Sequence, residues 1–159
     1  MAAKDSNLNI QELNDNFFYQ DGKLFWKSNG KEAGWIDNFG YKFNGFKGET
    51  YKTHRLIFFM HHGYLPKFVD HIDNDRLNNR IENLRAATAS QNSWNQRKRS
   101  TNTTGIKGIS WSERSKRWRA RCMVNYKSYF VGSFKTIDEA ANAIKAFRAE
   151  NHKEFARHS

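Results

Sequence analysis

The sequence has little of the material that builds disulfides, zinc sites or membrane spans. It contains one cysteine, Cys122, so no intrachain disulfide and no cysteine-rich zinc site can form. No stretch approaches the roughly 18 consecutive apolar residues of a transmembrane helix, and residues 1–15 lack the apolar segment of a secretion signal. We therefore expect a protein that works in a reducing intracellular setting, the cytoplasm.

Apolar residues are also scarce, which limits the size of any hydrophobic core. They make up 38% of the 159 residues, and the mean hydropathy is −0.91. Aromatic residues reach 15%, which is too many for a disordered chain. This length and composition indicate one ordinary domain or two small ones with largely aromatic cores.

Positive charge is concentrated in the last third of the chain. Residues 1–95 carry 12 Lys and Arg against 11 Asp and Glu, whereas residues 96–159 carry 15 against 5. The overall net charge of +11 favours an anionic partner, most often nucleic acid. The asymmetry indicates two modules with different tasks.

The first module is expected to begin with a small sheet and a helix. Residues 17–53 alternate aromatic runs with glycines, and the Asp21-Gly22 pair between two such runs is a hairpin signal. From His54 to His62 the apolar residues have helical spacing, and Gly63 is a typical residue for the end of that helix.

The stretch FVDHIDNDRLNNRIENLRAAT, residues 68–88, crowds three Asp and four Asn around one histidine, His71. We expect it to form strand, polar loop and strand. Thr88 and Gln91 have the spacing of a capping box, which predicts a helix from Thr88 to about Arg97. Such a ββα unit would bring Asp70, at the end of the first strand, opposite Asn92 in the first turns of the helix.

These residue types suit metal-dependent hydrolysis. A carboxylate and an amide oxygen are hard ligands for Mg²⁺ or Mn²⁺, one ion per site. Neutral His71 could take the proton of an attacking water. Asn83 could fix the orientation of the His71 side chain by hydrogen-bonding the loop. The alternative of a plain solvated turn stays open at this point. A calcium loop fails because Leu77 occupies a ligand position, and a zinc site fails because cysteines are lacking.

The run VDHIDNDRLNNRIENLRAATASQNSWN, preceded by THRLIFFMHHGYLP, resembles the HNH nucleases of the ββα-metal class, especially those of phage homing endonucleases. The resemblance covers roughly residues 50–96. It implies Asp70 and Asn92 as metal ligands, His71 as general base and Asn83 as the middle Asn. Many members have His at the position of Asn92. Arg55 and Arg85 are candidates for phosphate contacts, and His54 is a candidate for a buried residue that hydrogen-bonds the loop or, alternatively, a ligand.

The basic last third of the chain, residues 96–159, is predicted to form three strands followed by a helix. In RWRARCMV, Trp118, Ala120 and Cys122 alternate with arginines, so period two places the arginines on the opposite face. Thr136 and Glu139 form a second capping box, which predicts a helix over about 137–151. If that helix covers the Trp118 side, the arginine face stays open to DNA.

This third resembles the APETALA-type, or ethylene-response-factor-type, DNA-binding domain through GIKGISW, KRWRARCMV and VGSFKTIDEAANAIKAF, over about residues 103–156. Ser110 and Phe130 depart from the Arg and Trp of plant members, so base preference does not transfer. The DNA contacts predicted for this part of the chain, on the family's pattern apart from Trp111, are Lys107, Ser110, Trp111, Arg117, Arg119, Arg121 and Phe130.

We therefore predict an α+β protein with an HNH endonuclease domain at 1–96, containing hairpins at 17–53 and the ββα-metal core at 68–97. A basic linker follows at 97–105, and an APETALA-type domain at 106–159. The expected partner is double-stranded DNA, cut by a monomer or weak homodimer of phage or mobile-element origin. Two alternatives stay open: a non-catalytic DNA-binding regulator on a degenerate HNH scaffold, and a nuclease directed at RNA.

Overall fold

The computed structural model describes residues 8–95, 102–152 and 155. The chain forms two compact units, Met1–Thr88 and Ala89–Ser159, each with its own hydrophobic core. None of the helices in the described ranges has the length and apolar character needed to cross a bilayer. The predicted α+β class, with small antiparallel sheets and a C-terminal sheet packed on one helix, is confirmed. The predicted domain limits stay a prediction, and residues 97–101 of the proposed linker lie outside the described part.

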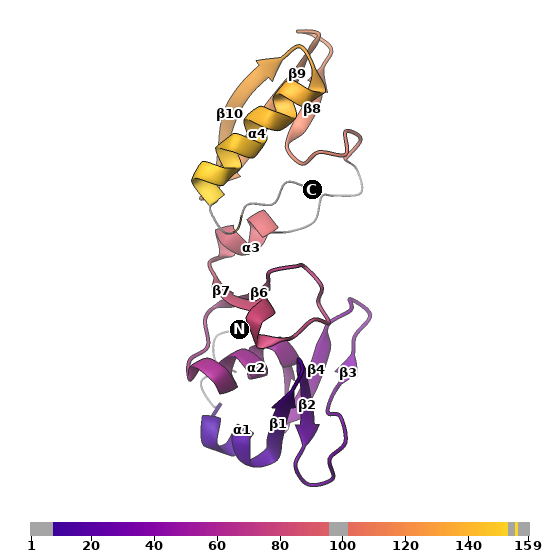
Figure 1. Cartoon of the computed structure of the whole chain (residues 1–159), viewed down its shortest axis with the longest axis vertical. Coiled ribbons are helices and arrows are strands. Elements are labelled where there is room, and N and C mark those ends of the chain that lie inside the picture. Colours follow the sequence, from indigo (N-terminus) through magenta and orange to yellow (C-terminus); the bar gives the residue numbers. More distant parts are fainter. Residues whose placement is uncertain (1–7, 96–101, 153–154, 156–159) are drawn as a thin grey trace. The chain divides into compact units, whose positions relative to one another are not determined.

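The first unit opens with a short helix and the predicted hairpin (Figure 1). Asp21 and Gly22 connect the two strands with φ angles of 47° and 81°, the left-handed values that a type I′ turn requires. At Gly22 a side chain would also meet the backbone of Arg80 at 2.8 Å, so the hairpin packs closely against the loop that follows His71. The elements are α1 (Ile10–Asn16), β1 (Phe17–Gln20) and β2 (Lys23–Trp26).

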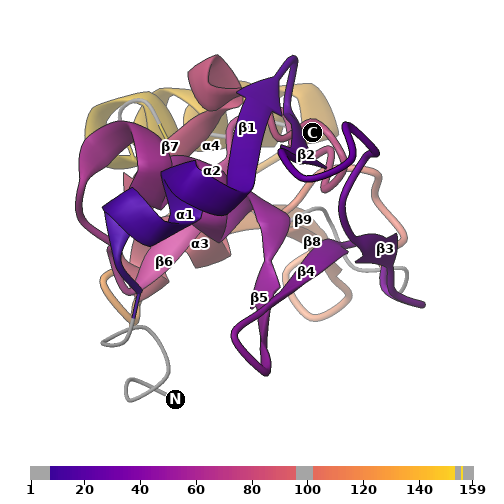
Figure 2. The same ribbon diagram turned by 90° about the horizontal axis from the view of Figure 1, so that it is seen from below.

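A second sheet and a helix complete the core of this unit. The sheet has the order β3-β4-β5 (Figure 2). The helix, α2, begins directly after β5 and ends at Gly63, whose φ of 73° confirms the predicted C-terminal stop. Its buried residues Leu56, Ile57 and Phe58 pack with the aromatic strands. The elements are β3 (Trp35–Ile36), β4 (Lys42–Phe46), β5 (Glu49–Lys52) and α2 (Thr53–His62).

The polar stretch forms the predicted strand, loop and strand. The two strands pair antiparallel, with Asp70 opposite Arg85 and His71 opposite Leu84. A 3₁₀ turn precedes the second strand, and a helix follows it, as the capping box at Thr88 predicts. The elements are β6 (Phe68–His71), the 3₁₀ turn (Ile81–Asn83), β7 (Leu84–Ala87) and α3 (Ala89–Asn95), of which α3 belongs to the second unit.

The second unit contains a three-stranded antiparallel sheet in the order β10-β9-β8, with α4 along one face (Figure 1). Ala120 and Cys122 from the sheet meet Ala140 and Ile144 from the helix in the core. The capping box is formed: Thr136 Oγ1 accepts from the N–H of Glu139 at 3.2 Å, and the Glu139 carboxylate accepts from the N–H of Thr136. The elements are β8 (Ile109–Ser112), β9 (Arg117–Val124), β10 (Lys127–Phe134) and α4 (Ile137–His152).

Candidate nuclease site and nucleic-acid interface

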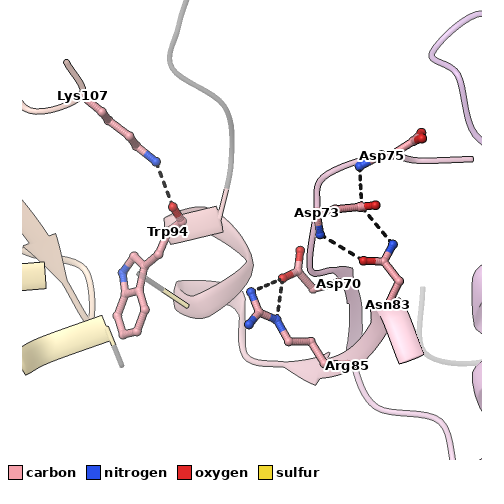
Figure 3. A network of polar contacts seen from close by, with 7 residues as sticks. All are labelled: Asp70, Asp73, Asp75, Asn83, Arg85, Trp94 and Lys107. Atoms are coloured by element: carbon pink, nitrogen blue, oxygen red, sulfur yellow. Dashed lines mark hydrogen bonds and ion pairs between the residues drawn. The ribbon is translucent and has the colours of Figure 1, made fainter. Parts of the chain in front are cut away.

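Asp70 lies buried at the end of β6 and forms an ion pair with Arg85 from the neighbouring strand (Figure 3). Arg85 donates from Nε at 3.1 Å and from a terminal nitrogen at 3.0 Å, and both bonds go to Asp70 Oδ2. The side chain of Arg85 is 15% exposed and that of Asp70 is 8% exposed. Arg85, predicted as a phosphate contact, therefore serves in this structure to fix the Asp70 carboxylate; its phosphate role stays a prediction.

His71 is held by Asn79, from the polar loop that follows it. Its Nε2 lies 2.8 Å from Oδ1 of Asn79, and both side chains are buried. A carbonyl oxygen can only accept, so this contact requires the proton on Nε2 and leaves the lone pair of the neutral ring on Nδ1. Nothing in the Asn78-Asn79 pair distinguishes the two amides by sequence, because only the folded loop decides which one points inward.

Asn83 joins the two ends of the loop that separates His71 from β7 (Figure 3). Its Oδ1 accepts from the N–H of Asp73 at 3.1 Å, and its Nδ2 donates to the Asp73 carboxylate at 2.9 Å and to the backbone oxygen of Asn78 at 2.7 Å. These are the loop contacts expected of Asn83. Its effect on His71 stays a prediction.

The Asp73 carboxylate is the acceptor at the centre of this loop. Burial raises its pKa, but hydrogen bonds from the Asp75 N–H and from the Asn78 and Asn83 amides outweigh burial and hold the pKa below its ordinary value. Asp73 therefore stays ionised and organises the loop through its hydrogen bonds.

His54 packs edge-on against His71, with ring centroids 4.7 Å apart. It is buried, and burial, followed by the nearby His71, Lys52 and Arg55, holds its pKa well below the ordinary value of 6.5. His54 is consequently a neutral ring that packs against His71 at the end of β6. Arg55, one residue on, donates to the backbone oxygens of Pro66 and Lys67 at 3.2 Å, which fixes the segment leading into β6.

The low pKa of His54 predicts a loss of stability on mild acidification. Below pH 6.5 the unfolded chain takes up a proton at His54 that the folded chain does not, so the free energy of unfolding falls as the pH drops below this value. In urea unfolding at about pH 7.5 and 5.5, His54→Gln should show a smaller pH-dependent loss than the wild type. The exposed His62→Gln is the matched control, and an unchanged pH dependence in His54→Gln would contradict this role.

Asn92, the second predicted metal ligand, lies on α3 and is half-buried. The C-terminal end of this helix contacts other residues of the second unit, to which α3 belongs. Lys107 Nζ donates to the backbone oxygen of Trp94 at 3.1 Å (Figure 3), and the Trp94 ring stacks on His152 at 4.1 Å. Lys107, predicted as a DNA contact, thus bonds the last turn of α3, where the helix dipole favours a cation.

The donor set fits a hard divalent cation. Carboxylate and amide oxygens suit Mg²⁺ or Mn²⁺, which keep several waters and need few protein ligands. Within the described ranges no group of three or more His, Cys, Asp or Glu side chains is placed to hold a metal. The ion-binding pair of Asp70 and Asn92 stays a prediction.

The arginines of β9 form the expected exposed row. Arg117, Arg119 and Arg121 face solvent, whereas Ala120 and Cys122 between them are buried, which confirms the period-two prediction. We call this row the arginine face.

Phe130 belongs to the arginine face, but Trp111 does not. Phe130 lies opposite Arg121, is 56% exposed, and its ring is 5.7 Å from the Arg119 guanidinium carbon. Trp111 pairs directly with Trp118, so it lies on the helix side of the sheet, where its Nε1 donates to Glu113. Register between β8 and β9 decides this placement.

Comparisons with known proteins agree with the position of the polar stretch. A family model described as HNH endonuclease matches residues 51–94, the range that contains Asp70, His71, Asn83 and Asn92. Protein 3.8 of Escherichia phage T7 is 36% identical over 110 residues, which cover 67% of this chain and 88% of that protein.

A second relative comes from a giant virus. The uncharacterized HNH endonuclease L560 of Acanthamoeba polyphaga mimivirus is 33% identical over 108 residues, covering 66% of this chain and 55% of that protein. No solved structure matches.

Proposed function

Because the chain belongs to the HNH endonuclease family, we propose that it is a Mg²⁺- or Mn²⁺-dependent endonuclease that hydrolyses DNA phosphodiesters to 5′-phosphate and 3′-hydroxyl ends. The observation that carries the proposal is the arrangement at the end of β6. There a buried carboxylate, Asp70, directly precedes a buried imidazole, His71, whose Nε2 is 2.8 Å from an amide oxygen. The relation to a phage protein supports action on DNA in the cytoplasm of a bacterial host.

The proposed roles follow from the contacts of each side chain. His71 takes the proton of the attacking water on Nδ1, because Nε2 already donates to Asn79. Asp70 and Asn92 would hold the ion, with Arg85 fixing the orientation of the Asp70 carboxylate. When bound, the ion supplies charge stabilisation for the scissile phosphate and the leaving oxygen. Asn83 keeps the loop in the shape that presents His71.

The second unit supplies DNA binding in this proposal. The support is its resemblance to the APETALA-type domain together with the arginine face, where three guanidinium groups stand 2 residues apart along one strand. Such a row can follow a phosphate backbone or enter the major groove. Arg55, Lys107 and Trp111 stay further candidates for DNA contact. A homing role, in which this unit selects the site that the first unit cuts, is the finer form of the proposal.

Cleavage of supercoiled plasmid tests the proposal. We expect nicked or linear product with Mg²⁺ or Mn²⁺, none in EDTA, and recovery when the ion is restored. Asp70→Asn should cut on the order of 100-fold more slowly at limiting Mg²⁺, because a neutral amide is a weaker ligand for a hard cation. Asn keeps the size of the side chain and an oxygen acceptor for Arg85, which avoids leaving a buried charge without any acceptor.

Three controls give the test its meaning. Circular dichroism should be the same for Asp70→Asn and the wild type. A wild-type protein that binds plasmid but never cuts it in either metal would overturn the nuclease proposal and favour the regulator. Competition between duplex DNA and duplex RNA for binding, measured at several salt concentrations, separates a DNA enzyme from one directed at RNA.

A further inference from the structure

The turn between β3 and β4 has a hydrogen-bonded backbone and presents an exposed aromatic ring. The Asp37 carboxylate accepts from the N–H groups of Phe39 at 3.0 Å and Tyr41 at 2.8 Å, and the Gly40 N–H donates to the Asp37 backbone oxygen at 3.0 Å. Gly40 has a φ of 77°, a conformation that suits glycine. Phe39, at the tip, is 74% exposed. Trp35 and Ile36, in the strand before the turn, are exposed too, so Phe39 extends a run of exposed apolar side chains of the kind that marks interaction sites.

This turn is joined to the loop that follows His71. Arg76, in that loop, donates to the backbone oxygen of Phe39, and its guanidinium carbon is 4.8 Å from the centre of the Tyr41 ring. The Tyr41 ring centre is in turn 6.5 Å from that of His71. The backbone of the turn that carries Phe39 is therefore tied to the loop that follows the proposed general base.

Cations surround the same tyrosine. Lys52 Nζ is 3.9 Å from the centre of the Tyr41 ring, so Lys52 and Arg76 both contact one aromatic ring. Burial, with further contributions from nearby Arg55 and Arg76, lowers the pKa of Lys52, and Asp37 opposes this effect. Positive groups are thus gathered locally in a part of the chain that carries almost no net charge. Such a cluster is complementary to phosphates.

We propose that the turn 37–40 is a DNA wedge: Phe39 inserts between base pairs beside the cut, while Lys52 and Arg76 contact the flanking phosphates. This deepens the proposed function, on which it rests for its substrate. An apolar side chain inserted between base pairs unstacks them and kinks the duplex. An exposed ring on a hydrogen-bonded turn, with cations beside it, is complementary to DNA, which offers base faces and phosphates together. Such a contact would let the first unit bind the duplex by itself.

The wedge is tested by the change in plasmid linking number that insertion causes. Relaxed closed plasmid is incubated with the full chain and a eukaryotic topoisomerase I in EDTA, so cleavage plays no part, and the topoisomers are separated on a gel. The wild type should lower the linking number. Phe39→Ala should abolish this shift and weaken plasmid binding about tenfold, whereas Phe39→Trp should keep the shift.

The controls separate this inference from the nuclease proposal. Tyr64→Ala removes another exposed ring of the first unit, 54% exposed, and should leave the shift intact. A wild-type chain that causes no shift, or a shift retained in Phe39→Ala, overturns the wedge. Cleavage of the same plasmid in Mg²⁺ is measured separately, so a chain that unwinds DNA without cutting it counts against the nuclease proposal alone.

Discussion

Replacing His71 by alanine should slow DNA cleavage by on the order of 10²–10⁴-fold while leaving DNA affinity nearly unchanged, because a general base contributes to the transition state and little to substrate binding. His71 is 6% exposed and follows directly on Asp70, so replacing its side chain removes the proposed base without altering the arginine face. Single-turnover cleavage of plasmid at saturating protein measures the chemical step, and filter binding in EDTA measures affinity. If His71→Ala cut as fast as the wild type, the base assignment would be wrong.

Substitutions at Asn79 give the matched comparison for His71. Asn79→Asp keeps an oxygen acceptor for His71 Nε2, whereas Asn79→Leu of similar size removes it. We expect Asn79→Asp to retain more activity than Asn79→Leu, and the ¹⁵N spectrum of the His71 ring to report the Nε2–H tautomer in the wild type but not in Asn79→Leu. Equal activity and equal ring spectra in both variants would contradict the positioning of His71 by Asn79.

Replacing Arg117, Arg119 and Arg121 together by alanine should weaken DNA binding on the order of 100-fold or more at low salt. If each arginine neutralises one phosphate, the slope of log affinity against log salt should decrease by about 0.9 per residue, or about 2.7 in total. Among the described residues no carboxylate forms an ion pair with the arginine face. Fluorescence anisotropy of a labelled duplex over a salt series gives both quantities.

A variant with the same loss of charge elsewhere separates position from net charge. Arg114, Lys135 and Lys145 are also exposed in the second unit but lie outside β9. Their replacement by alanine should change the salt slope much less. At protein concentrations that saturate the plasmid, the arginine-face variant should cleave at the wild-type rate. If both triple variants lost affinity equally, the arginine face would be a solvated surface and not the DNA interface.

Local rules in the sequence were sufficient for much of the fold. The Asp21-Gly22 hairpin, the stop at Gly63, the capping box at Thr136 and the alternation along β9 each depend on residues within a few positions of one another. Their conformations follow from backbone sterics, from hydrogen bonds over three residues and from the period of a strand. The same locality made Asp70 and His71 recognisable, because adjacent residues at a strand end need no long-range information to be found together.

Only the tertiary structure decided which partners these residues have. Strand register places Arg85 on Asp70 and puts Trp111 on the opposite side of the sheet from the arginine face. The folded loop selects Asn79 over Asn78 for His71, and a contact across 37 positions joins Arg76 to Phe39. A one-residue change of register reverses the face of every side chain, and contacts between distant segments depend on the whole packing arrangement. The sequence alone therefore determined which polar and charged groups lie close together along the chain, and the tertiary structure determined which contacts orient them.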